Sequence, residues 1–303
     1  MAEDCFHDVR LHFYLGNYQQ CINDAQRLSV KSEGGKRIRD YWIYRSMAAQ
    51  KKYNVILANF EGQAAHGLIQ PLLRLAEFHA GKRTAEEIYH EYVSTKNKWS
   101  EKEKAIYATI MLDAERPEEA LRITYEDKNI ELIALSVHAY ILMNRFDKAE
   151  ALLKDVLQDY EFHPLFQQAK GWLALAIGQD TAAYSDKETG ALKLYSDLVQ
   201  RYGNSVSLLI GKAASLISMG QTEEAETVLQ TALSMDPQSV EANALLTVSA
   251  SQSRLPTQNN STRHLLKQLQ VQAPEHQFVI DYKNAHDQID KLQMEPNEAE
   301  STC

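Results

Sequence analysis

The stretch Phe13–Leu28, FYLGNYQQCINDAQRL, joins a glycine turn to a segment with helical spacing of small and apolar residues. Gly16 is followed by an aromatic residue, Tyr18, then by Cys21, and four positions later by Ala25. Glycine commonly ends one helix, and apolar residues three and four apart indicate a helical face. The stretch therefore predicts a helix–turn–helix unit in which Cys21 is a small residue at the contact between helices.

The same pattern recurs along the chain. In each copy a turn leads to one position, here termed the anchor, at which the two helices of a unit cross. A small anchor is favoured because a larger side chain at a close crossing costs roughly 1 to 3 kcal/mol by overpacking. The predicted anchors are Cys21, Ile56, Ala85, Ala120, Ala149, Ala191 and Ala225, with a weaker eighth near Thr262.

Successive anchors are 35, 29, 35, 29, 42, 34 and 37 residues apart. These steps scatter around the 34-residue period of tetratricopeptide repeats. Polar residues at 179–189 and 254–262 lengthen the steps of 42 and 37, and we interpret both stretches as enlarged loops between helices. The spacing predicts an all-α, right-handed solenoid of about eight tetratricopeptide-like repeats.

The end of the chain continues this pattern and then departs from it. Phe278, Tyr282, Ala285, Ile289 and Leu292 form one apolar helical stripe, which predicts a C-terminal capping helix. Residues 294–303 are acidic and are expected to be a disordered tail. The expected organisation is one solenoid domain at residues 1–293 and a tail at 294–303.

The composition favours a helical, cytoplasmic protein. The chain has only 12 glycines and 7 prolines in 303 residues, and strong helix formers dominate its periodic segments. A net charge of −9 disfavours nucleic-acid binding, which depends on clustered lysines and arginines. There is no run of 18 apolar residues and no apolar leader, and the three cysteines form no paired framework.

Catalytic and cofactor motifs are missing from the sequence. It has neither a phosphate-binding loop nor a GxGxxG motif. His90-Glu91 begins like a zinc-helix motif, but Ser94 stands where the second histidine would be. Cys21 is explained by its anchor position, so it needs no role as a nucleophile. We expect no enzyme activity, no metal and no cofactor.

A candidate partner-binding groove follows from the repeat geometry. The residue eleven positions before each anchor is expected on the concave wall, which places Arg10, Arg45 and Arg74 in one row. Such a groove would suit an extended peptide whose carboxylates or carbonyls accept hydrogen bonds from arginine. We expect that replacing the three arginines with glutamate weakens binding without unfolding. In an alternative register, shifted by one residue, the arginines are solvated and the aromatics lie in the helix core. The predicted groove consists of Phe6, Arg10, Phe13, Tyr14, Tyr41, Arg45, Arg74, Phe78, His138, Ile141, Leu142, Trp172 and Leu175.

With its repeats placed, the chain resembles the epsilon subunits of coatomer, the COPI vesicle coat. The stretch Phe13–Leu28 carries the most specific part of the resemblance. It continues through YRSMAAQKKY at residues 44–53, GWLALA at residues 171–176 and the helix at residues 282–292. The resemblance therefore covers nearly the whole chain, although its alanine- and leucine-rich parts are common to many tetratricopeptide proteins.

The resemblance implies a non-enzymatic subunit of a cytosolic heteroheptameric coat. Such a subunit would bind and stabilise the C-terminal region of the coatomer alpha subunit. It would be recruited peripherally to Golgi membranes and COPI vesicles, in Golgi-to-endoplasmic-reticulum and intra-Golgi transport. The alternative is a co-chaperone or another peptide-binding scaffold built from the same repeats, and an enzyme that uses the repeats only for docking would need further sequence for its catalytic domain.

Overall fold

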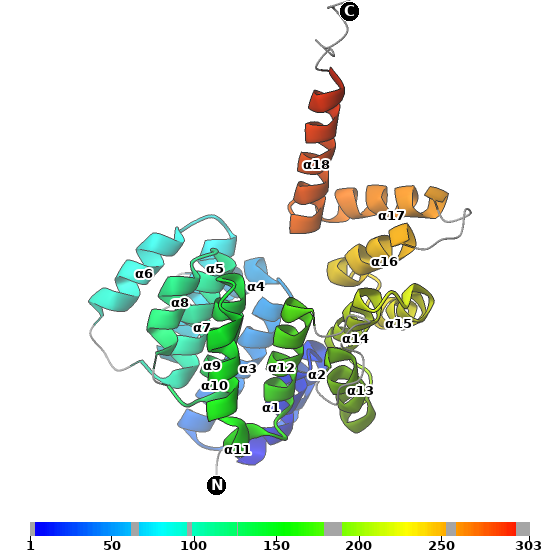
Figure 1. Cartoon of the computed structure of the whole chain (residues 1–303). Helices are drawn as coiled ribbons and strands as arrows, with labels where there is room; N and C mark the ends of the chain where they lie inside the picture. The colour runs from blue at the N-terminus through cyan, green and yellow to red at the C-terminus, as the bar shows by residue number, and fades with distance from the viewer. Residues whose placement is uncertain are drawn as a thin grey trace, which may run out of the picture.

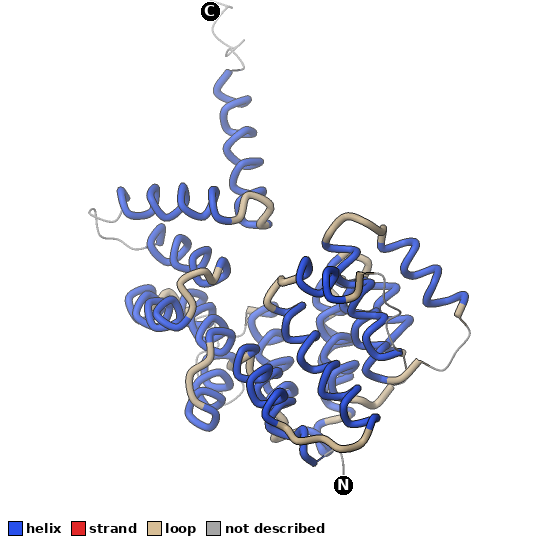
Figure 2. The backbone as a smooth tube through the Cα atoms, turned by 180° about the vertical axis from the view of Figure 1, so that it is seen from behind, coloured by secondary structure: helices blue, strands red, loops and turns tan. Residues whose placement is uncertain are grey.

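Helices make up all the regular structure in the part of the chain that the computed structural model describes (Figure 2). That part comprises residues 4–61, 67–95, 99–125, 127–178, 190–252 and 259–294. Two short 3-10 helices, η1 (Asp4–Phe6) and η2 (Gly67–Ile69), accompany the α-helices. The α-helices are α1 (His7–Tyr14), α2 (Tyr18–Arg27), α3 (Glu33–Ala49), α4 (Tyr53–Asn59), α5 (Gln70–His79), α6 (Ala85–Ser94), α7 (Glu101–Asp113), α8 (Pro117–Thr124), α9 (Ile130–Leu142), α10 (Phe146–Asp155), α11 (Leu157–Tyr160), α12 (Pro164–Ile177), α13 (Ala191–Tyr202), α14 (Val206–Ser218), α15 (Thr222–Met235), α16 (Val240–Gln252), α17 (Asn259–Gln272) and α18 (Gln277–Met294).

These helices alternate as first and second members of helix pairs. The first members are α1, α3, α5, α7, α9, α12, α14 and α16, and each is followed by its second member, with α18 at the end. Within the described ranges this gives eight pairs, the short α11 between α10 and α12, and one final helix. The predicted all-α solenoid of tetratricopeptide-like repeats is confirmed. No helix in the described part of the chain is long and apolar enough to cross a membrane.

A left-handed residue forms the turn inside most of the pairs. In six pairs this residue is Gly16, Lys51, Gly81, Glu115, Asn144 or Gly220, each four or five residues before an anchor. The amide after each one donates to a carbonyl five residues back, as Asn17 does to His12 at 2.9 Å. This is the helix-ending motif that satisfies the last carbonyls of the first helix. The recurring turn therefore has one backbone geometry, although only three of its six residues are glycines.

Several helices begin at a polar side chain that accepts a hydrogen bond from an otherwise unpaired backbone amide. Thr84 begins α6 with a capping box to Glu87, and Ser205 accepts from the amide of Leu208 at the start of α14. Asn129 does the same for Glu131 at the start of α9. These caps stabilise a helix by typically about 1 kcal/mol each. At α9 the cap also fixes the first turn, which contributes Glu131 to the site described below.

The seven predicted anchors are all buried. Cys21 shows how such a position packs, because its Sγ accepts a hydrogen bond from Ser46 Oγ on α3 at 3.1 Å. Buried apolar clusters follow one another along the chain, each shared by neighbouring helix pairs. This succession of local cores is the packing expected of a solenoid, in which each repeat contacts its neighbours.

One cluster breaks this rule of neighbours. It joins Leu15, in the first turn, to Ala174, Tyr195 and Leu208 on α12, α13 and α14. Figure 1 shows α1 and α2 beside α12 and α13, while α16 to α18 extend away from them. The first helix pair is therefore in contact with the sixth and seventh pairs.

The C-terminal helix packs only through its beginning. Val279 is buried and Phe278 is partly buried against α16, but Tyr282 is 42% exposed and Ile289 is 55% exposed. The predicted stripe is helical as expected, yet Tyr282 and Ile289 are not covered by the described part of the chain. Met294, which the sequence interpretation assigned to the tail, ends α18. The rest of the predicted tail, residues 295–303, and the loop at 179–189 lie outside the described residues.

Candidate functional site

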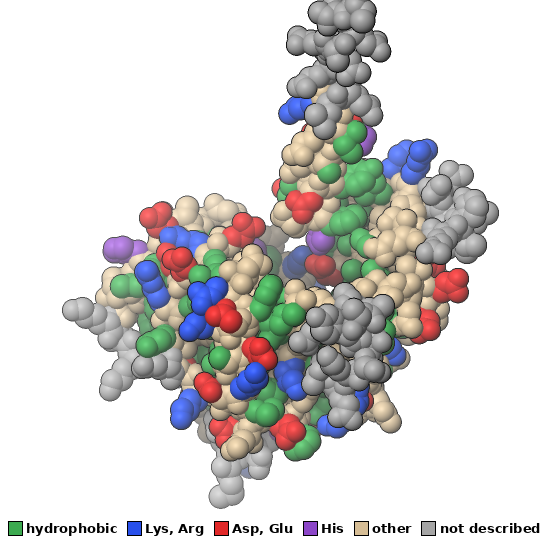
Figure 3. Space-filling model, in the orientation of Figure 1, with side chains coloured by type: hydrophobic (Ala, Val, Ile, Leu, Met, Phe, Trp, Pro, Cys, Tyr) green, Lys and Arg blue, Asp and Glu red, His purple; other side chains and the backbone are tan. Residues whose placement is uncertain are grey.

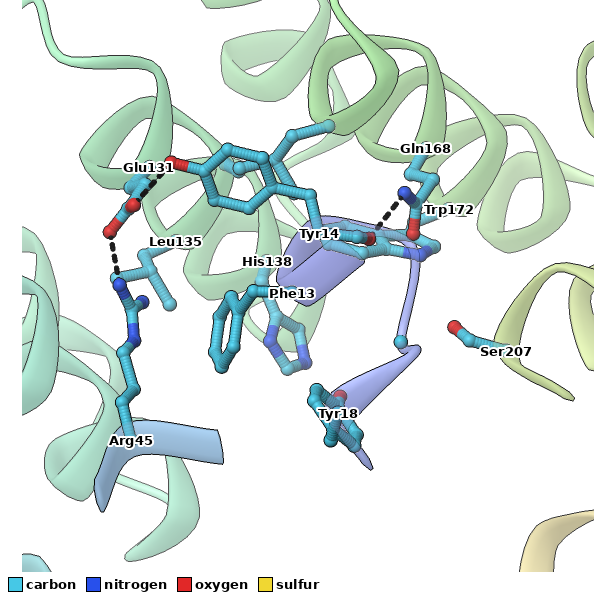
Figure 4. A pocket seen from close by; sticks show the side chains of 13 residues that line it. Phe13, Tyr14, Tyr18, Arg45, Glu131, Leu135, His138, Gln168, Trp172 and Ser207 are labelled. Atoms are coloured by element: carbon cyan, nitrogen blue, oxygen red, sulfur yellow. Dashed lines mark hydrogen bonds and ion pairs between the residues drawn. The ribbon is translucent and has the colours of Figure 1, made fainter. Parts of the chain in front are cut away.

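A cavity of about 210 Å³ lies where the first helix pair faces α9, α12 and α14 (Figure 4). Its floor and walls come from segments far apart in the sequence. The lining residues are Phe13, Tyr14, Gly16, Tyr18, Arg45, Glu131, Ala134, Leu135, His138, Leu165, Gln168, Trp172 and Ser207.

The turn at residues 14–16 closes one side of this cavity. Leu15 is 2% exposed, and the carbonyl of Tyr14 accepts a hydrogen bond from Gln168 Nε2 at 2.8 Å. Gly16 lies so close to α14 that a Cβ at this position would be 2.7 Å from the Cβ of Ser207. Gly16 also has a φ of +80°, which favours glycine. The turn therefore needs glycine both for its backbone conformation and for its contact with α14.

A buried ion pair connects α3 to α9 at the edge of the cavity. Arg45 Nη1 donates to Glu131 Oε2 at 2.8 Å, and Tyr14 Oη donates to the other oxygen of the same carboxylate. Figure 4 shows this chain of hydrogen bonds from α3 through Glu131 to the first helix. The Arg45 guanidinium also lies over the rings of Phe13 and Trp42, at 4.4 and 5.2 Å from their centroids. Cation–π contacts of this kind stabilise a desolvated arginine.

The charges of this network set its protonation state. Burial raises the pKa of the Glu131 carboxyl, but the Arg45 charge and the hydrogen bonds from Tyr14 and Arg45 outweigh burial and hold it below its usual value. Burial, and then the adjacent Glu131 charge, raises the pKa of Tyr14. Glu131 is therefore ionised at neutral pH, while Tyr14 keeps the proton that it donates.

The rest of the cavity wall is mostly apolar. Leu135, Leu165 and Trp172 surround it, and the His138 ring lies 6.3 Å from the Trp172 ring. Concave, largely apolar walls with a few polar groups are typical of binding sites. The lining contains no cysteine, and its one carboxylate is fully engaged by Arg45 and Tyr14. Among the residues that the structure describes, no group of three His, Cys, Asp or Glu side chains could hold a metal ion.

Five of the thirteen predicted groove residues line this cavity: Phe13, Tyr14, Arg45, His138 and Trp172. Phe6 and Tyr41 are buried in the helix core, and Phe78 packs against it. Ile141 and Leu175 pack against the second and third buried clusters, and Leu142 is exposed. Partner binding at any of these positions stays a prediction.

Arg10, Arg45 and Arg74 do not form the row of groove arginines that the repeat count predicts. Arg45 is only 8% exposed, because Phe13 of α1 packs against its guanidinium. It is also paired with Glu131. Arg74 pairs with Glu77 at 2.8 Å and with Glu91 at 3.0 Å, whereas Arg10 lies partly buried on α1. The expectation that all three can be reversed without unfolding is wrong for Arg45, since a glutamate there would bury a second carboxylate beside Glu131.

Several lining residues were missed by the sequence interpretation. Glu131 and Leu165 lie seven positions before His138 and Trp172, the groove residues predicted on α9 and α12. Ser207 lies seven positions before Ala214, which is eleven positions before the anchor Ala225. Residues seven apart share a helix face, so extending the predicted face by two turns toward the helix start would have found them. Gly16 and Tyr18 carry no such signal, because they line the cavity only where the first helix pair packs against the sixth and seventh pairs.

Comparison with known proteins gives one consistent result. The family model described as coatomer epsilon subunit matches residues 2–296. Coatomer subunit epsilon-1 of Arabidopsis thaliana is 31% identical over 296 residues, covering 95% of this chain and 96% of that protein. Coatomer subunit epsilon of Caenorhabditis elegans is 28% identical over 296 residues, covering 96% and 98%. Among solved structures, MamA (41-end) of Desulfovibrio magneticus RS-1 has a TM-score of 0.41 and 15% identity, over 64% of this chain and 98% of that chain.

Proposed function

Because the chain belongs to the coatomer epsilon subunit family, we propose that it binds the C-terminal region of the coatomer alpha subunit in its concave cavity. Members of this family are structural coat components, so the chain is a coat subunit and not an enzyme. Through the alpha subunit it would join the rest of the COPI coat, on the cytoplasmic face of Golgi membranes and vesicles. It would act in Golgi-to-endoplasmic-reticulum and intra-Golgi transport.

The cavity between the first helix pair and α9, α12 and α14 is the observation that carries this proposal. Its walls come from several repeats, so a segment bound there would contact them together. Trp172, Leu135 and Phe13 offer aromatic and apolar surface, which dominates the binding energy of most protein interfaces. A partner segment that fills the cavity would thus link repeats that are distant in sequence.

In this proposal Arg45 and Arg74 do not bind the partner directly, as a row of groove arginines would. Arg45 and Arg74 are engaged within the chain, so they would hold the walls rather than grip the partner. His138 and Ser207 are exposed polar side chains on the cavity wall, and His138 is available for a direct contact. Apolar side chains would therefore give most of the affinity, and polar contacts around them would fix the register.

A co-chaperone that grips a C-terminal carboxylate is disfavoured by the same geometry. Such a clamp requires lysine and asparagine at the groove positions that Phe6 and Arg10 occupy here. Phe6 is buried in the core and Arg10 is partly buried. Neither position can serve as that clamp.

The test is co-expression of the full chain with the C-terminal region of a coatomer alpha subunit, followed by size-exclusion chromatography and titration calorimetry. We expect one stoichiometric complex. His138→Glu should weaken it by at least about tenfold, because the new charge would be desolvated without a partner. The matched control is His90→Glu on α6, an exposed histidine outside the cavity lining, and it should change the affinity by less than about twofold.

Two results would contradict different parts of the proposal. Failure of the wild-type chain to form a complex would reject the alpha subunit as partner. A complex that His138→Glu and His90→Glu affect equally would keep the partner but reject the concave cavity as its site.

A further inference from the structure

A second groove lies between α17 and residues 282–287 of α18. Figure 1 shows these two helices meeting at a corner, away from the first helix pair. It encloses about 340 Å³. Arg263 and Lys267 of α17 line one wall, and Tyr282 and Lys283 of α18 line the other. The groove is therefore built from two helices that belong to the extended end of the molecule.

The charge of this groove is opposite to that of the protein. The chain carries a net charge of −9, yet Arg263, Lys267 and Lys283 meet here and Asp287 is the one carboxylate in the lining. Within the described ranges, none of the three cations forms an ion pair with a carboxylate. The α17 segment at residues 259–272 contains no Asp or Glu at all. These cations attract an anionic group that the described chain does not supply.

The groove also offers apolar surface. Leu266 is partly buried at its base, and Tyr282 is 42% exposed on the α18 wall. Residues 281–289 of α18 are all exposed, so nothing in the described chain covers this wall. In the space-filling view, apolar side chains lie along the junction of α17 and α18 (Figure 3). The site thus combines positive charge with an exposed aromatic ring.

We propose that this groove docks an acidic segment of a partner protein. Glutamate or aspartate side chains of that segment pair with Arg263, Lys267 and Lys283, and one apolar side chain packs on Leu266 and Tyr282. A membrane surface fits less well, because α18 also carries Asp281, Asp287 and Asp290, which an anionic bilayer would repel. Of these three carboxylates only Asp287 lines the groove, so a chain segment between the two helices meets one carboxylate and three cations. This site is independent of the function proposed for the concave cavity.

The test measures fluorescence anisotropy of a labelled heptapeptide with six glutamates around one phenylalanine. The full chain is titrated into this peptide and into a control in which glutamines replace the glutamates. We expect saturable binding of the acidic peptide and none of its control. Because such contacts depend on charge, binding should weaken as the salt concentration rises.

Two triple variants with the same change of net charge identify the site. Arg263→Glu with Lys267→Glu and Lys283→Glu should weaken binding by at least about tenfold, as expected for three exposed ion pairs that become repulsive. The control reverses three exposed cations elsewhere, at Lys31, Arg37 and Lys148, and should weaken it by less than about threefold. Unchanged helicity by circular dichroism establishes that both variants fold.

Equal weakening by the two triple variants would overturn the proposal, since net charge alone would then explain binding. Absence of binding to the wild-type chain would also overturn it. If the peptide binds only after residues 295–303 are deleted, the occupant is the chain's own acidic segment and not a partner. If the groove variant loses binding to vesicles containing phosphatidylserine but not to the peptide, the site is a membrane contact and the proposal is wrong.

Discussion

The buried pair Arg45–Glu131 should be the most sensitive point of the N-terminal half. Their side chains are 10% and 11% exposed, and the pair joins α3 to α9. Removing one partner of a buried ion pair leaves an uncompensated charge and typically costs about 3 to 5 kcal/mol. A domain is commonly stable by only about 5 to 15 kcal/mol, so Arg45→Met or Glu131→Leu should nearly unfold this region.

The double variant should be less damaging than either single change. Replacing both charges with apolar residues of similar volume is often neutral or stabilising. Tyr14 would still lose its acceptor, which costs about 1 to 3 kcal/mol for a buried hydroxyl. We therefore expect a coupling free energy of at least about 2 kcal/mol between Arg45 and Glu131.

The measurement is urea unfolding followed by circular dichroism, with hydrogen exchange of α3 and α9 as a local readout. Local exchange is needed because repeat proteins do not always unfold in one step. Single variants should lose protection in both helices, and the double variant should regain it. Additive costs in the double variant, or single costs below about 1 kcal/mol, would refute the buried-pair argument.

Three further predictions concern the same half of the molecule. Gly16→Ala should destabilise the protein by about 2 to 4 kcal/mol in urea unfolding, because it adds a clash with α14 to an unfavourable φ. Gly81→Ala should cost about 1 kcal/mol, because Gly81 has a similar φ of +67° but no atom lies within 4 Å of the new Cβ. The free energy of unfolding should fall as the pH drops below 4.5, the ordinary pKa of a glutamate, because the pKa of Glu131 is lowered in the folded state and its ionised form stabilises the fold. Glu131→Gln should flatten this part of the pH profile of unfolding, and an unchanged profile would contradict the prediction. Exposed Cys5 should react rapidly with a thiol reagent, while Cys21, whose pKa burial raises to about 11, should react only in urea, and rapid labelling of Cys21 in the native protein would disprove its anchor role.

Part of the cavity could be predicted from the repeat arithmetic. Counting eleven residues back from Ala149 placed His138 on the cavity wall, and the same count from Ala191, with allowance for the insertion at 179–189, placed Trp172 there. The same count chose Arg45, which does line the cavity but is held by Glu131. It could not foresee this pairing because the count gives the face of a helix, not the neighbour that covers it.

The sequence by itself determined the repeats of this protein. Turn residues, small anchors and apolar spacing are local signals, so the helix pairs and their order follow from segments of about 34 residues each. The family resemblance rests on the same local stretches, and the family match over residues 2–296 agrees with it.

Only the tertiary structure decided that the first helix pair meets the fifth, sixth and seventh pairs. The link from Tyr14 to Glu131 spans 117 residues, and the link from Gln168 to Tyr14 spans 154. Such contacts depend on the small rotation between successive repeats, which accumulates along a solenoid and is not encoded at any one position. The cavity, the burial of Arg45 and the need for glycine at residue 16 all follow from that accumulated curvature.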